Sequence, residues 1–256
     1  MDHFSASRRP RGFTLVELLV TLSILAVLAT LTMVGTRKAL ESARMAANLS
    51  NLRNAGSILM CLESDNGAFP PGYNWSTGLS WASLVVNYKT SGRAKQDKIV
   101  LSPVVAREIP PQLNSETISN YGVNPMIFPD NEVINGSVSS KYQTAPLRLL
   151  RPHQQILLGD ALPRAAKVPY GQSMGLWWAL RGGPTGNTWA NPPIASPATS
   201  ERKITLPANL RRLTHDSGAG LPAFRNNGKG HFFFGDGHVE ALVQDELKQK
   251  HFAVSY

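Results

Sequence analysis

The sequence has very little cysteine, because Cys61 is the only one in 256 residues. No intramolecular disulfide can form and no cluster of thiolates can bind a metal, so the fold must depend on packing alone. Cys61 lies between Met60 and Leu62 in a stretch with helical periodicity. We therefore expect it to be a small buried hydrophobic residue rather than a nucleophile.

The sequence also lacks the motifs of zinc metalloproteases and of phosphate-binding loops. It contains neither His-Glu-x-x-His nor a phosphate-binding glycine loop. Residue types that suit a metal hydrolase are present, but their spacing carries no information: Asp160, His215, Asp216, His231, Asp236 and His238. We expect a turn-stabilising Asp236 and surface histidines, and we predict that the protein is not an enzyme.

Positive charge exceeds negative charge, but it is not concentrated on one binding surface. The chain has 26 Lys plus Arg and 17 Asp plus Glu, which gives a net charge of +9. Basic side chains cluster at residues 8–11 and then recur singly or in pairs, without interleaved aromatic residues. We expect a solvated surface and no nucleic-acid partner.

One long apolar run is present near the N-terminus. Residues Phe13 to Val34 include one charged side chain, Glu17. As a helix this run would cover roughly 33 Å, enough to cross a bilayer, so we predict a transmembrane helix at 13–35. Arg37 and Lys38 follow the run, so charge bias orients it imperfectly, although the short basic leader favours a cytoplasmic N-terminus.

The cleavage signal lies before the apolar run, whereas a secretory signal peptide has its cleavage site after it. Residues 11–17 read Arg-Gly-Phe-Thr-Leu-Val-Glu. This order resembles the prepilin-type cleavage and methylation motif of type IV pilins and type II secretion pseudopilins, and the resemblance continues through Leu31. It implies a leader at 1–12, cleavage after Gly12 by a prepilin peptidase, and methylation of the new amino terminus at Phe13.

A carboxylate within hydrocarbon costs about 2.5 to 3.5 kcal/mol, so Glu17 needs a reason to be there. One interpretation is a tolerated charge near a helix end that reaches the interface. The resemblance implies another, in which Glu17 pairs with the terminal amine of a neighbouring subunit during assembly.

The helix is expected to continue beyond the membrane over 36–65. Residues 36–62 contain no proline, and apolar positions recur every three or four residues. This predicted apolar face comprises Met45, Leu49, Leu52, Gly56 and Leu59. Asn66-Gly67 and Pro70-Pro71 predict the helix end, so the head would cover 66–256.

Short apolar runs separated by Gly, Pro, Asn and Ser predict an antiparallel sheet in the head. The predicted strands are Ile99–Val105, Gln154–Gly159, Gly175–Leu180 and His231–Val243, the last forming a hairpin around Gly235-Asp236-Gly237. Residues Gly182–Ser200 are expected to form a loop. Together with the resemblance, this predicts an α+β, pilin-like fold in which a long N-terminal helix packs on an antiparallel sheet.

The C-terminal hairpin resembles the signature of processing-associated prepilin-like proteins, in which a His is followed by nine residues and Asp-Gly. Here the Asp-Gly is Asp236-Gly237, but Asn226 stands where that subgroup has histidine. Looser similarities also lie elsewhere, at Asp65-Asn66-Gly67, Phe69-Pro70-Pro71, Trp81 in a short helix, Tyr121-Gly122-Val123-Asn124 and Gly159-Asp160.

No cofactor is required by the sequence, although the resemblance makes a calcium site worth considering. Its candidate ligands are Asp160, Asp216 and Asp236, without a compact calcium-binding loop. The tryptophans Trp177, Trp178 and Trp189 could mark a ligand surface, but core packing explains such residues more often.

Two hypotheses follow. In the first, the protein is a structural subunit in the bacterial inner membrane, single-pass, with an extracytoplasmic head. Its partners would be a prepilin peptidase and other pilin or pseudopilin subunits, in a filament that the sequence does not assign to a pilus or a secretion pseudopilus. In the second, the leader is only an anchor for a binding or metal-dependent hydrolytic head.

Overall fold

The structure is a computed structural model. It describes residues 13–74, 77–94, 97–104, 119–124, 127–128, 132–134, 137–139, 149–161, 201, 203–204, 222–225 and 227–252. The chain divides into two compact units, Met1–Ala43 and Arg44–Tyr256, which are described separately below.

The first unit consists, where it is described, of the N-terminal part of helix α1 (Leu15–Asn66). Its large apolar side chains are exposed from Phe13 through Val34 and again at Leu40. Within the described residues, α1 is the one helix long and apolar enough to cross a bilayer, and none of its most apolar stretch is buried. An exposed apolar surface of this length fits the hydrocarbon core of a bilayer.

In the second unit, α1 buries one face. The buried residues are Asn48, Leu52, Ala55, Gly56 and Leu59. The predicted apolar face is thus confirmed at Leu52, Gly56 and Leu59, while Met45 and Leu49 are partly buried. The helix ends at Asn66 as predicted, and Gly67 follows with a φ of 71°, a left-handed conformation that glycine adopts without strain.

The main sheet has four strands in the order β3-β6-β7-β8, and all neighbours are antiparallel. Their bounds are Tyr121–Val123, Ile156–Asp160, Lys229–Phe234 and Val239–Val243. The predicted α+β fold is confirmed, as is the hairpin of β7 and β8. Its turn contains Gly237, whose φ of 92° explains the need for glycine there.

Two smaller antiparallel pairs complete the described strands. They are β1 (Tyr73–Asn74) with β2 (Leu79–Ser80), and β4 (Glu132–Ile134) with β5 (Ser137–Ser139). Helix α2 (Trp81–Thr90) begins at the N-cap Ser80, whose side chain accepts a hydrogen bond from the backbone N–H of Ser83. The predicted short helix at Trp81 is therefore confirmed.

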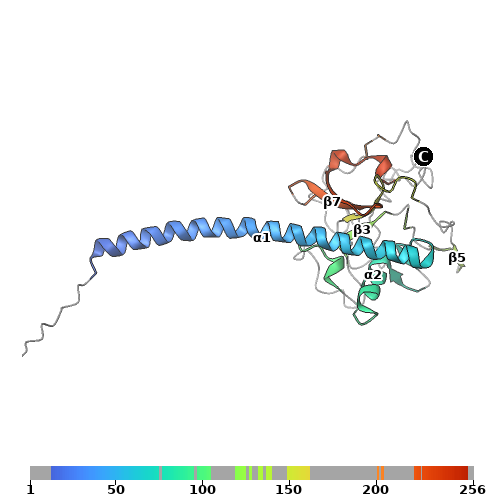
Figure 1. The fold of residues 1–256 in the computed structure, drawn as a ribbon, viewed down its shortest axis with the longest axis horizontal. Coiled ribbons are helices and arrows are strands. Elements are labelled where there is room, and N and C mark those ends of the chain that lie inside the picture. The colour runs from blue at the N-terminus through green and yellow to red at the C-terminus, as the bar shows by residue number, and fades with distance from the viewer. Residues whose placement is uncertain are drawn as a thin grey trace, which may run out of the picture. The chain divides into compact units, whose positions relative to one another are not determined.

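The core of the second unit forms around α1. In Figure 1, β3 and β7 lie on one side of this part of α1 and α2 lies on the other. Leu52, Ala55 and Leu59 of α1 share one buried cluster with side chains from α2, β3, β6 and β7. Elements on both sides of α1 thus pack against the same part of this helix. Close packing from both sides explains why its buried residues are mostly small or apolar.

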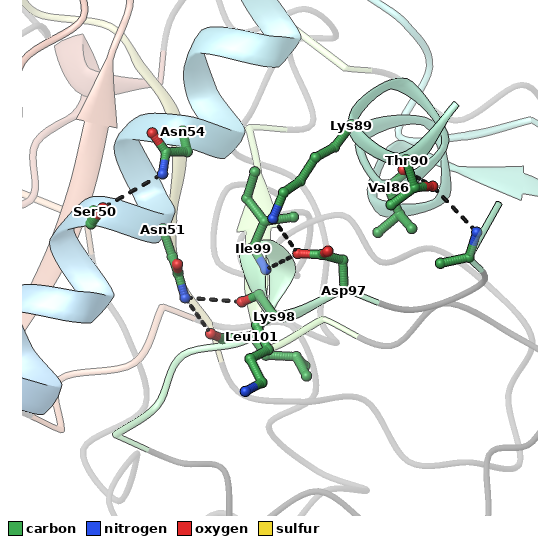
Figure 2. A network of polar contacts seen from close by, with 11 residues as sticks. Ser50, Asn51, Asn54, Val86, Lys89, Thr90, Asp97, Lys98, Ile99 and Leu101 are labelled. Carbon is green, nitrogen blue, oxygen red and sulfur yellow. Dashed lines mark hydrogen bonds and ion pairs between the residues drawn. The ribbon is translucent and has the colours of Figure 1, made fainter. Parts of the chain in front are cut away.

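The predicted strand at Ile99–Val105 is wrong over its described residues. Ile99 and Val100 lie in a 3₁₀ helix, η1 (Lys98–Val100), whose N-cap Asp97 accepts a hydrogen bond from the backbone N–H of Ile99 at 2.8 Å (Figure 2). The cap and the docking of this segment on α1 outweigh the strand preference of an apolar run. Two further 3₁₀ helices are η3 (Gln244–Glu246) and η4 (Gln249–His251).

The expectation that Cys61 is buried is also wrong, because its side chain is exposed. It follows the buried Leu59 by two residues, which places it about 200° around the helix and on the opposite face. The predicted strand Gly175–Leu180 and loop Gly182–Ser200, with Trp177, Trp178 and Trp189, lie outside the described residues.

Candidate functional site

Glu17 is held at the start of α1 by Thr14. The Glu17 Oε2 atom accepts hydrogen bonds from the Thr14 N–H at 2.9 Å and from its hydroxyl at 2.8 Å. In return, Thr14 Oγ1 accepts from the Glu17 N–H at 3.2 Å. This reciprocal arrangement is a capping box, and it satisfies backbone donors that the helix itself leaves unpaired.

Thr14 was not among the predicted site residues, although a signal for it was present. Thr-x-x-Glu before an apolar run is the sequence form of a capping box. The geometry gives Glu17 a local role in addition to any role between subunits. Phe13 is exposed, and Gly12 lies outside the described residues.

The other polar side chains of the apolar stretch bond back to their own helix. Hydroxyl groups donate to main-chain carbonyls three or four residues earlier at distances of 2.8 to 3.0 Å, and they belong to Thr21, Ser23, Thr30, Thr32 and Thr36. A helix whose hydroxyls are satisfied internally can lie in hydrocarbon without unpaired polar groups.

The second unit contains a buried polar cluster that joins α1 to the sheet. Asn48 Nδ2 donates to Asp160 Oδ1 at 3.1 Å, and the hydroxyl of Tyr121 donates to Asn48 Oδ1 at 2.7 Å. Asp160 Oδ2 accepts from the His231 N–H at 2.9 Å and lies 3.0 Å from His231 Nδ1. All four residues are at least 95% buried.

The phenol of Tyr121 is a hydrogen-bond donor in this cluster rather than an anion. Burial, and then the negative charge of Asp160, raises the pKa of Tyr121 far above its ordinary value. Asp160 and His231 were predicted candidates for metal chemistry, whereas Asn48 and Tyr121 were not predicted. In the structure each of the two candidates hydrogen-bonds within the cluster, as a buried polar network requires.

Residues 7–33 match the family model described as the prokaryotic N-terminal methylation motif. The matched segment contains Gly12, Phe13 and Glu17, together with the exposed apolar part of α1 as far as Met33. This chain carries a prepilin-type N-terminus. No curated protein and no solved structure matches the chain at a significant level.

The prepilin-type motif and the long apolar helix together fit a membrane-anchored, single-pass, type IV pilin-like protein. Such proteins are generally structural subunits that a peptidase processes and that assemble with other subunits. The match ends at residue 33 and leaves the head without a family assignment. In the C-terminal signature, Asn226 lies outside the described residues.

Asp236 stabilises the turn of the β7–β8 hairpin, as the sequence predicted. Its Oδ1 atom accepts from the His238 N–H at 3.2 Å and lies 2.5 Å from His238 Nδ1. Partial burial of Asp236 opposes ionisation, but the hydrogen bonds from His238 outweigh it and lower the pKa of the Asp236 carboxyl. His238 is exposed, as predicted, whereas His231 is buried.

The structure does not bring Asp160 and Asp236 together. Phe234 pairs with Ile156, four residues before Asp160, and Asp236 lies two residues beyond Phe234. The two carboxylates are thus separated along the strands by at least about 13 Å, the rise of the four residues from Ile156 to Asp160. Asp216, the third candidate calcium ligand, lies outside the described residues. Across the described part of the chain, no three His, Cys, Asp or Glu side chains group closely enough to hold a metal ion.

Residues 171–175 read Gly-Gln-Ser-Met-Gly, the spacing of the nucleophile elbow of serine hydrolases. They lie outside the described residues. The elbow joins a strand of a largely parallel sheet to a helix. Every strand pair in the described sheets is antiparallel, so the spacing alone supports no catalytic assignment.

Proposed function

We propose that this protein is a structural pilin or pseudopilin subunit. A prepilin peptidase cleaves it after Gly12 and methylates Phe13, and the mature subunit is stored in the bacterial inner membrane before it assembles into a type IV pilus or type II secretion pseudopilus. The observation that carries this proposal is the methylation motif at 7–33, in register with an exposed apolar helix.

Glu17 has two successive roles in this proposal. In the stored subunit its carboxylate is satisfied by Thr14 at the first turn of α1. During assembly the same carboxylate pairs with the amine of Phe13 in a neighbouring subunit, which neutralises both charges in an apolar environment. The hydrogen bonds of 2.9 and 2.8 Å from Thr14 to Glu17 support the first role, and the methylation motif supports the second.

The head lies outside the cytoplasm and provides contacts to other subunits, and no cofactor or catalytic step is part of the proposal. A binding or hydrolytic head that uses the leader only as an anchor is the competing hypothesis. It requires an active or binding site in the head, and among the described residues no three His, Cys, Asp or Glu side chains group closely enough to hold a metal ion.

The first experiment is mass spectrometry of the N-terminus after membrane extraction from cells that contain a prepilin peptidase. We expect a mature chain that begins at N-methylated Phe13. Gly12→Ala should leave the leader uncleaved because the peptidase requires glycine before the cut. Gly35→Ala is the matched control, since a Cβ at Gly35 meets no atom within 4 Å. An intact Met1 in the unsubstituted protein, or a cut beyond Val34, contradicts the proposal.

A further inference from the structure

The buried face of α1 would by itself tolerate sliding along the sheet. Apart from Asn48, it consists of Leu52, Ala55, Gly56 and Leu59. Apolar contacts are not directional, and a displacement by four residues, about 6 Å along the axis, returns a similar face to the sheet. Something other than apolar burial must therefore select one axial register.

Asn48 provides a polar match at one position only. Its amide donates to Asp160 of β6 at 3.1 Å and its carbonyl accepts from Tyr121 of β3 at 2.7 Å. Its Nδ2 also lies 3.4 Å from His231 Nδ1 of β7. If α1 slid so that Leu52 took this place, the buried Tyr121 hydroxyl and Asp160 carboxylate would each lose a partner.

Gly56 provides a steric match eight residues later. A Cβ placed on Gly56 would lie 2.4 Å from two ring carbons of Phe233, so the ring packs directly against the helix backbone. A displacement by four residues in either direction brings Leu52 or Met60 to this place. Neither side chain fits at this place, because even a single methyl group there would overlap the Phe233 ring.

We infer that Asn48 and Gly56 fix the axial register of α1 against the sheet, and that Asn48 is a positioning residue for subunit assembly. Buried polar residues in an otherwise apolar helix face are best known for specifying register rather than for adding stability. The consequence for assembly rests on the proposed function, because a filament built on α1 requires the same register in every subunit.

The register can be measured on the full-length chain in detergent micelles. One nitroxide label is attached to the exposed native Cys61, and a second to Cys introduced at the exposed Lys229, and their distance is measured by pulsed electron paramagnetic resonance. Phe233→Leu is introduced to relax the steric match at Gly56. In this background N48L is compared with N54L, whose Asn54 is exposed and has only a 3.5 Å contact to Ser50 Oγ.

We expect one narrow distance distribution for N54L/F233L. For N48L/F233L we expect a second population displaced by up to about 6 Å, the rise of four helical residues. A folded N48L/F233L with the single distribution of its control overturns the inference. Should that variant fail to fold, N48S/F233L makes the same test, because serine is too short to contact Tyr121 and Asp160 together.

The measurement uses the isolated subunit, so it does not depend on processing or on filament formation. A displaced distance in a chain that never assembles would support the register inference and count against the proposed function. A single distance in a chain that does assemble would overturn the register inference and support the proposed function.

Discussion

His251 is a partly buried histidine that the fold keeps neutral. Burial, and then the positive charges of Lys250 and Lys248, lowers the pKa of His251 to about 4. Its Nδ1 atom accepts a hydrogen bond from the Lys248 N–H at 3.2 Å, and its ring contacts the edge of Phe234 at 6.1 Å between centroids. A protonated ring could not accept that hydrogen bond.

The stability of the head should therefore fall on mild acidification. Between pH 6.5 and 4 the unfolded chain binds a proton at His251 that the folded head does not, so folding stability decreases as pH falls through this window and levels off below it. The loss attributable to His251 is on the order of 3 kcal/mol. The free energy of unfolding can be measured at pH 7 and at pH 4.5 by tryptophan fluorescence during urea unfolding, and the difference between the two values gives the loss.

The comparison that isolates this residue is H251N against H153N. Asparagine at 251 keeps a hydrogen-bond acceptor but does not titrate, so H251N should lose less stability between the two pH values than the unsubstituted protein. His153 is exposed, and H153N should keep the original pH dependence. Equal pH dependence in all three proteins would contradict a His251 that the fold keeps neutral.

At the scale of elements, the side chain of Asn51 connects α1 to the irregular segment around η1. Asn51 Nδ2 donates to the main-chain carbonyls of Lys98 and Leu101, both at 2.9 Å, as Figure 2 shows. The neighbouring Asp97 receives hydrogen bonds from Ile99 N–H and from Lys89 of α2 at 2.7 Å. The segment around η1 is thus held from two helices.

Removing the Asn51 amide should loosen this segment without unfolding the head. N51A removes the side-chain donor from both main-chain carbonyls, although the Lys98 carbonyl still accepts from the Leu101 N–H at 3.0 Å, and the local cost is about 1 to 3 kcal/mol. Hydrogen exchange at the amides of residues 98–102 should accelerate roughly 5- to 100-fold, while β6 and β7 keep their protection. The control is N54A on the next turn of α1, which should leave this exchange unchanged. Uniform acceleration throughout the head would argue against a local attachment.

At the scale of the whole molecule, the two units present different surfaces. The described part of the first unit exposes its apolar side chains, and the second buries its apolar side chains around α1. In the proposed function the first surface is covered by lipid before assembly and by other subunits afterwards. In that first unit Thr14 holds the Glu17 carboxylate by hydrogen bonds, and in the proposed function this carboxylate changes its partner on assembly.

Glu17→Gln should separate processing from assembly. The peptidase acts at Gly12, five residues earlier, so N-methylated Phe13 should still be found by mass spectrometry. Glutamine cannot form the ion pair with a neighbouring amine, and the amount of protein in sheared filament fractions should fall at least tenfold. S23A is the control, because Ser23 contacts only its own helix at Leu19. Filament yields equal to the control would favour the anchor hypothesis.

Local sequence patterns predicted the parts of the protein whose causes are local. The apolar run, the end of α1 at Asn66 and the β7–β8 turn each depend on a few consecutive residues, and each agrees with the structure. The strand predicted at Ile99–Val105 is wrong over its described residues in part because Asn51, which holds this segment on α1, is 47 residues away from Lys98. No periodicity within the segment records that contact.

The sequence by itself determined a prepilin-type N-terminus and a helix long and apolar enough to cross a membrane, because composition and spacing within one segment are enough to specify both. Only the tertiary structure decided that Asn48 meets Tyr121 and Asp160, residues that lie 73 and 112 positions away. Buried polar groups must find partners, but a sequence does not state which ones. The same reason explains why the sequence could offer Asp160 as a candidate metal ligand but could not show the hydrogen bonds that it accepts at the contact between helix and sheet.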